Sequence, residues 1–226
     1  MKPGSGKREA AGGKPGSLRL AVLAVATLAA PLQAQLTRHT TFGLGGGSTR
    51  LTSVTGAGTA ILSGLTIGGS GRIGGGLLSV EGGYRQGGLA PDSGTATTQD
   101  LVEAHLMVAV RPVSWLSVLA GPHARAFIAP SGTERWLLFE ARVRAEGTVV
   151  SPAVSTYVEL WAALGGSVNV GTGSPSARGG EAGITVRLPR SPVWARLAYG
   201  MDRATQSGSV NARSVEDIRV SIGIGR

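Results

Sequence analysis

Apolar and polar residues alternate with a period of two along most of this sequence, and this pattern constrains the fold more than any other feature. In the stretch 100–111 the even positions are mostly apolar, whereas the odd positions include Glu103 and Arg111. After a turn at Pro112, the stretch 115–127 repeats the same phase. Because successive side chains of a β-strand point to opposite faces, the pattern predicts two neighbouring strands that share one continuous apolar face.

Similar alternation recurs along the chain and predicts an all-β protein of ten strands. The predicted strands are 37–47, 58–68, 72–84, 100–111, 115–127, 135–149, 156–170, 181–188, 193–201 and 217–225. Tight turns near Gly69, Pro112, Pro152 and Pro189 alternate with longer polar loops, the first of them over 48–55. This rhythm is typical of a closed up-and-down antiparallel barrel, with turns at one rim and loops at the other. The prediction is about ten strands, with eight or nine as the alternative if the glycine-rich first stretch does not pair.

The stretch 135–149 indicates which face of the strands meets lipid. Its odd positions are mostly apolar, while Glu140, Arg142, Arg144 and Glu146 share the other face. Four charges on one face of one strand fit poorly in a dry core but suit the lumen of a transmembrane β-barrel. A soluble core of this size is expected to bury several large aromatic residues, yet the chain has only 3 Phe, 3 Tyr and 4 Trp. A secreted soluble β-sandwich that acts as a binding or adhesion module is the second alternative.

The first 34 residues differ from the rest of the chain. Five basic residues precede a run from Leu20 to Leu32 that contains no charge. This order is typical of a secretory signal peptide, with Ala34 at the expected cleavage site. The apolar run is too short for a membrane-spanning helix, which needs about 20 residues. We therefore expect a signal peptide over residues 1–34 and one barrel domain over residues 35–226.

Charge and composition argue against several classes of function. Beyond the first 34 residues, 17 basic residues face 12 acidic ones, and all 17 are scattered arginines, so a nucleic-acid surface is not expected. The chain has no cysteine, and its 3 histidines lack ligand spacing, so we expect no disulfide and no metal site. Glycine-rich stretches such as 43–48 and 71–76 lack the Lys-Ser/Thr of a phosphate loop, and we expect no cofactor.

The signal-peptide pattern and the strand rhythm of about residues 37–226 resemble the small outer-membrane β-barrel proteins of double-membraned bacteria. The resemblance is architectural and fixes no subfamily. It implies insertion into the outer membrane, contact with the lipid bilayer and the outer-membrane assembly machinery as a partner. Any protein or ligand partner at the loops stays open.

Charged residues on the polar face of the predicted strands would line the lumen of such a barrel. This set is Glu81, Arg85, Glu103, His105, Arg111, His123, Arg125, Glu140, Arg142, Arg144, Glu146, Glu159, Glu181, Arg187, Arg196 and Arg219. Side chains largely fill a barrel of about ten strands, because aqueous channels belong to barrels of about 16 or more strands. We therefore favour an ion-pair network that plugs the lumen, with a structural or surface-interaction role. A narrow porin-like pore for small solutes or ions, selected by charged rings, is the alternative.

Ten-stranded barrels also resemble the outer-membrane proteases of the omptin kind, which work with Asp and His at the outer rim. His105 and His123 lie on neighbouring predicted strands and both point inward, so they can approach each other. The acidic candidates are Asp92, Asp100 and Asp202. The paired Asp-Asp and Asp-His arrangement of that family has no counterpart here, and acid-base catalysis needs a partner within hydrogen-bonding reach. We expect no catalysis and assign both histidines to the lumen network.

Trp115 and Trp194 each begin a predicted strand directly after a tight turn. Such positions suit an aromatic belt at the membrane interface near the inner rim. Ordinary packing is the alternative for both residues, and the sequence favours neither.

Overall fold

The structure is a computed structural model that describes residues 39–94, 96–171 and 173–225. The predicted signal peptide lies outside the described residues. The ten strands are β1 His39–Thr55, β2 Gly58–Gly75, β3 Leu78–Pro91, β4 Gln99–Val113, β5 Leu116–Ala129, β6 Gly132–Ser151, β7 Val154–Val168, β8 Pro175–Arg187, β9 Val193–Gln206 and β10 Ala212–Gly225. Among the described residues, no helix is both long and apolar enough to cross a membrane.

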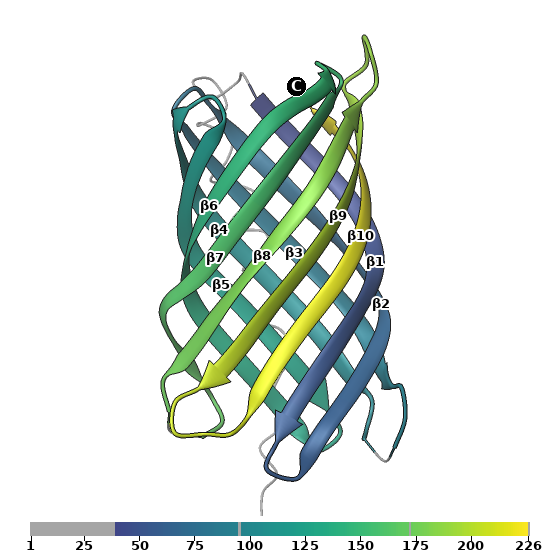
Figure 1. Cartoon of the computed structure of the whole chain (residues 1–226), viewed down its shortest axis with the longest axis vertical. Coiled ribbons are helices and arrows are strands. Elements are labelled where there is room, and N and C mark those ends of the chain that lie inside the picture. Colours follow the sequence, from purple (N-terminus) through teal and green to yellow (C-terminus); the bar gives the residue numbers. More distant parts are fainter. Residues whose placement is uncertain (1–38, 95, 172, 226) are drawn as a thin grey trace, which may run out of the picture. The chain divides into compact units, whose positions relative to one another are not determined.

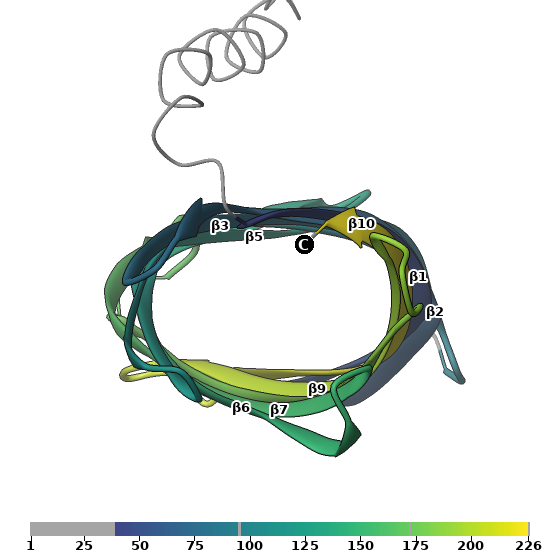
Figure 2. The ribbon, with the colours of Figure 1, turned by 90° about the horizontal axis from the view of Figure 1, so that it is seen from above.

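Each strand pairs antiparallel with its neighbours in sequence, and β1 pairs with β10 to close the barrel. The closing register runs from Thr41 opposite Gly225 to Val54 opposite Ala212. The strands are tilted (Figure 1), and a view along the barrel shows an oval ring around the lumen (Figure 2). The predicted all-β, closed up-and-down barrel of about ten strands is confirmed. The eight-strand count and the β-sandwich are wrong, because β1 pairs on both sides and the sheet forms a single ring.

The first connections lie elsewhere than the sequence predicts. The predicted turn at Gly69 is wrong, because Gly69 lies within β2 and pairs with Leu44 and Tyr84. The chain turns at Gly76 instead, where φ is +60°, a conformation that glycine adopts without steric cost. The predicted loop over 48–55 is strand as well. Both errors fall where glycine and small polar residues hide the alternation.

The connections distinguish two rims of the barrel. The terminal rim, named for the strand ends at His39 and Gly225, carries the β2–β3, β4–β5, β6–β7 and β8–β9 turns. The loop rim carries the remaining connections, including the longer ones between β3 and β4 and between β7 and β8. This division follows the predicted rhythm of turns and loops, although two of the expected loops are tight turns.

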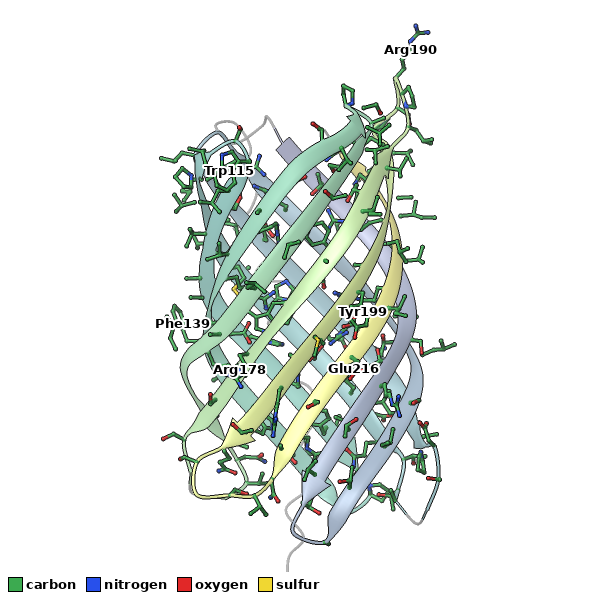
Figure 3. All side chains as sticks on the ribbon, viewed as in Figure 1. Trp115, Phe139, Arg178, Arg190, Tyr199 and Glu216 are labelled. Carbon is green, nitrogen blue, oxygen red and sulfur yellow. The ribbon has the colours of Figure 1, made fainter. Side chains whose placement is uncertain are left out.

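The outward face of the barrel is apolar over the part next to the terminal rim. Leu160 and Ile222 expose 63% and 61% of their surfaces there. Figure 3 shows Trp115 at this rim, with Phe139 and Tyr199 farther along the outer wall. These exposed apolar side chains form a band around the barrel, as expected for a surface that meets lipid.

On β1 and β8–β10 the outward face becomes polar toward the loop rim. Arg178 on β8 lies directly opposite Arg203 on β9, and Arg50 on β1 lies opposite Glu216 on β10. Arg178 and Glu216 lie nearer the loop rim than Tyr199 does (Figure 3). A strand needs about 9–11 residues to cross a bilayer, and the strands here have 13 to 20 residues. The barrel is therefore taller than its apolar band.

Near the loop rim the inside of the barrel is apolar. The buried side chains there are Leu51, Leu62, Leu89, Leu101, Phe127, Trp136, Leu138, Ala177, Ala204 and Val215, with Ala60, Ala163 and Val168 packed against them. We call this set the apolar plug. All ten strands contribute to it, and its ten core side chains are at most 5% exposed. At this level the inside of the barrel is apolar. The outside is polar on β1 and β8–β10, whereas Ile128 and Leu137 keep it apolar on β5 and β6.

A bulge between β6 and β7 places Val168 in the plug. The register shifts between Phe139 and Glu140, so that Ser167 lies opposite the outward-facing Leu137. The predicted outward position of Val168 is therefore wrong, since one extra residue inverts the face of every later residue in a strand.

Candidate functional site

Every residue of the predicted charge set lies on the inward face of the barrel. Glu140 is 1% exposed, and the others line one cavity of about 370 Å³. The cavity reaches the terminal rim at Gly74, Gly75 and Gly76. None of the plug side chains named above lines it. The lumen is thus divided into a charged part open toward the terminal rim and an apolar part next to the loop rim.

Arg125 on β5 connects three strands in the middle of the lumen. Its Nη1 donates to Asp202 Oδ1 on β9 at 2.9 Å, and its Nε donates to Glu103 on β4. Glu103 also accepts a hydrogen bond from Arg85 on β3, whose Nη1 lies 3.1 Å from Asp217 Oδ2 on β10. All five side chains are buried or nearly so. Because a buried charge without a partner is costly, these pairs hold the walls in one arrangement.

A second set of pairs connects β5, β6 and β7. His123 Nδ1 lies 2.6 Å from Glu140 Oε1. Arg142 donates to Glu140 at 2.8 Å and to Glu159 at 3.1 Å, and its guanidinium lies 5.4 Å from the ring centre of Trp161. One arginine thus links two carboxylates on different strands, which is the arrangement that satisfies buried charges.

The network continues across the lumen to β3. Arg144 on β6 donates to Glu159 at 2.7 Å and to Glu81 at 2.9 Å. Arg72 on β2 lies 3.4 Å from the same Glu81. Five strands, β2, β3, β5, β6 and β7, are therefore joined by one chain of charge-assisted contacts.

Pairing is looser toward the terminal rim. Arg111 Nη2 and Glu146 Oε2 lie 3.5 Å apart, and both side chains are about one third exposed. Arg219 donates to Glu181, which also accepts from the hydroxyl of Tyr157. The more exposed Arg111–Glu146 pair contributes little to stability, about 0–1 kcal/mol.

Two of the predicted arginines face no carboxylate in the described part of the chain. Arg196 donates to Thr185 Oγ1 at 3.0 Å, and its guanidinium lies 4.9 Å from the ring centre of Tyr157 and 5.2 Å from that of Trp194. The Arg187 side chain makes neither a hydrogen bond nor an ion pair with any described residue. Both line the cavity.

The alternation pattern alone could have found two further members of the network. Asp202 and Asp217 have the same parity as the inward arginines of their strands, so they belong to the lumen on sequence grounds. Arg72 is hidden by the misplaced turn, because the true turn at Gly76 gives β2 the opposite parity to β3.

The structure brings the two lumen histidines together but leaves two of the three acidic candidates away from them. The rings of His105 and His123 are 6.3 Å apart, edge to face. Asp100 faces outward, and Asp92 is exposed beyond the end of β3. Asp202 is buried in the ion pairs described above. The described residues contain no group of three or more His, Cys, Asp or Glu suited to a metal ion.

The two tryptophans expected at a membrane interface differ in position. Trp115 is 57% exposed at the terminal rim, as an interfacial belt requires (Figure 3). Trp194 is 5% exposed and points into the lumen, where it packs against Gly43 and Gly223. The interfacial prediction for Trp194 is wrong, since its parity along β9 is that of the inward Arg196.

No protein-family profile and no curated protein matches this chain. A solved outer-membrane channel from Pseudomonas putida F1 is similar, with 10% identity over 84% of this chain and 97% of its own, and a TM-score of 0.51. The translocator domain of the autotransporter NalP from Neisseria meningitidis has 13% identity over 92% and 95%, with a TM-score of 0.49. The outer-membrane protease OmpT from Escherichia coli has 9% identity over 83% and 96%, with a TM-score of 0.48. The likeness to the channel shows that this chain has the fold of bacterial outer-membrane β-barrel proteins, as predicted.

Proposed function

We propose that this chain is an outer-membrane β-barrel without catalytic activity, that its lumen is closed, and that its role is structural or surface interaction. The outward apolar band supports insertion into a bilayer, since lipid-facing residues of membrane barrels are apolar and lumen-facing ones polar. The similar solved channel from Pseudomonas putida F1 is an outer-membrane protein. Export by a signal peptide over residues 1–34 and insertion by the outer-membrane assembly machinery belong to the same proposal.

The two rims suggest an orientation. Outer-membrane barrels have short periplasmic turns and longer loops outside the cell. The loop rim therefore faces the cell exterior, and the terminal rim faces the periplasm. The polar part of the outer wall, which carries Arg50, Arg178 and Arg203, then lies on the cell-exterior side of the apolar band. It is the part of the barrel available to a protein or ligand partner at the cell surface.

The apolar plug is the observation that most strongly supports the proposal of a closed lumen. Phe127 is 2% exposed within it, and the guanidinium of Arg213 lies 4.6 Å from the Phe127 ring centre on the side of the loop rim. Arg213 Nη2 donates to Glu134 at 2.5 Å, and Glu134 also accepts from Trp136 Nε1 at 2.6 Å. An ion that crosses the barrel would lose its water in this layer, which is costly without compensating partners.

Single-channel recording in planar lipid bilayers tests the closed lumen. We expect the wild-type protein to be silent. The double variant Phe127→Ala, Trp136→Ala removes two aromatic side chains of the plug, and we expect discrete conductance steps from it. The matched control is Phe139→Ala, Trp115→Ala, which removes the same residue types from the outer wall and leaves the barrel silent.

Discrete steps in the wild-type protein would contradict the closed lumen and favour the narrow pore instead. Equal conductance of the plug variant and the outer-wall control would show that the steps come from lost barrel stability rather than from the plug. Steps found in the plug variant alone identify the plug as the seal.

A further inference from the structure

The cavity at the terminal rim carries more positive than negative charge. Nine arginines and seven carboxylates line it. Seven of the nine arginines lie within 3.5 Å of a carboxylate, and every one of the seven carboxylates has such a partner. Arg187 and Arg196 are the two arginines of the cavity that have no such carboxylate among the described residues. The unbalanced positive charge of the cavity is therefore located on two neighbouring strands, β8 and β9.

Arg187 and Arg196 lie close together on the same wall. In the register of β8 with β9, Arg187 is opposite Trp194 and Thr185 is opposite Arg196. The two arginines are thus diagonal neighbours, with Cα atoms about 7 Å apart. The register thus places two like charges on one wall, and an acceptor bound between them would stabilise both.

The guanidinium of Arg196 is held in one orientation. It lies between the rings of Tyr157 and Trp194, and its Nε donates to Thr185. Its two terminal nitrogens have no hydrogen-bond partner among the described residues. A guanidinium fixed by aromatic rings, with its outer nitrogens free, is prepared to bind two oxygens of one anion.

Trp194 adds a donor without a partner to this wall. Its Nε1 is buried and donates to no acceptor in the described part of the chain. Buried N–H groups are nearly always paired. The ring has little freedom to turn away, because a Cβ at Gly43 or at Gly223 would already overlap it. Arg187, Arg196 and Trp194 thus each place on β8 or β9 a donor that no described residue accepts.

We propose that the cavity at the terminal rim binds a phosphate-bearing anion between Arg187 and Arg196. A phosphate offers several oxygens to two forked donors and neutralises both charges. The volume of about 370 Å³ exceeds the roughly 30 Å³ that one water molecule occupies in the liquid. The cavity therefore has room for more than the phosphate group itself. The site does not depend on the closed lumen, because the cavity ends before the plug.

Calorimetric titration of the full chain in detergent micelles with inorganic phosphate, at constant ionic strength in chloride, tests the site. We expect saturable binding of one phosphate per barrel. Arg187→Gln and Arg196→Gln should each weaken it about 10- to 150-fold, since one charge-assisted bond contributes about 1.5–3 kcal/mol. Arg196→Lys keeps the charge but loses the planar fork, and should also weaken binding. Arg190→Gln is the control, because Arg190 lies at the tip of the β8–β9 turn, outside the cavity (Figure 3).

Migration in a detergent gel before and after boiling checks that each variant forms a closed barrel. If Arg196→Gln does not fold, Arg187→Gln decides the matter, since the Arg187 side chain has no partner to lose within the described barrel. Absence of saturable heat in the wild type up to about 10 mM phosphate would overturn the proposal. So would equal binding by the wild type, Arg187→Gln and Arg190→Gln.

Discussion

Arg125 on β5 and Asp202 on β9 form an ion pair across the lumen, although 77 residues separate them in the sequence. β5 and β9 are not neighbours in the ring of strands. The pair therefore connects walls that backbone hydrogen bonds do not join. It is a cross-link within the oval barrel of Figure 2 and gives the lumen network a role in holding the barrel in shape.

Removal of Arg125 should destabilise the barrel more than removal of an outer arginine. We expect Arg125→Met to lower the free energy of unfolding by about 3–5 kcal/mol, because Asp202 is left buried without a partner. The double variant Arg125→Met, Asp202→Leu should recover most of this loss, since an apolar pair of similar volume replaces the ions. Urea unfolding in lipid vesicles, followed by tryptophan fluorescence, measures both. Arg178→Met is the control for an exposed arginine, and a loss as small as that of the control would refute the cross-link.

The apolar plug should contribute more to stability than the outer band does, side chain for side chain. Phe127→Ala leaves a cavity among buried residues and should cost about 3–5 kcal/mol. Phe139→Ala removes the same side chain from the lipid-facing wall, where lipid fills the space, and should cost less. Unfolding midpoints in vesicles compare the two, and a larger loss for Phe139→Ala would mean that the plug is not a packed core.

Gly43 is required by the tryptophan that it faces. A Cβ at Gly43 would overlap the Trp194 ring, and overpacking of this kind costs about 1–3 kcal/mol. Gly43→Ala should therefore lower the unfolding midpoint, and Trp194→Phe in the same chain should restore part of it, because phenylalanine lacks the outer atoms of the indole. Gly147→Ala is the matched control, since no heavy atom lies within 4 Å of its added Cβ. Equal effects of the two alanines would disprove the contact.

The period-two pattern predicts the barrel, the strand number and the inward face because one rule of strand geometry governs all three. It fails where the rule is interrupted. Glycine at Gly69 looks like a turn although the strand continues, and the extra residue in the β6–β7 bulge inverts the face of Val168. Neither event changes local composition enough to be visible in the sequence.

The plug escapes prediction for a different reason. Leu101 and Phe127 have the parity of the charged residues on their strands, so the alternation already places them inside the barrel. The sequence does not show that apolar inward residues from all ten strands lie at the same level along the barrel axis. That depends on the tilt and register of the strands, as does the meeting of Arg125 with Asp202.

Spin labels along β10 test the central claim most directly, namely that the apolar face meets lipid near the terminal rim and the polar outer face meets water near the loop rim. The chain has no cysteine, so single-cysteine variants from Ser214 to Ile222 label one position each. In reconstituted bilayers, collision with dissolved oxygen reports lipid and collision with a soluble nickel chelate reports water. We predict oxygen-accessible labels at the outward positions Ile218, Val220 and Ile222, chelate-accessible labels at Ser214 and Glu216, and low oxygen access at Asp217. High oxygen access at Asp217 and Arg219, with low access at Ile218 and Val220, would contradict this claim, because the charged face would then meet lipid and the apolar face would line the lumen.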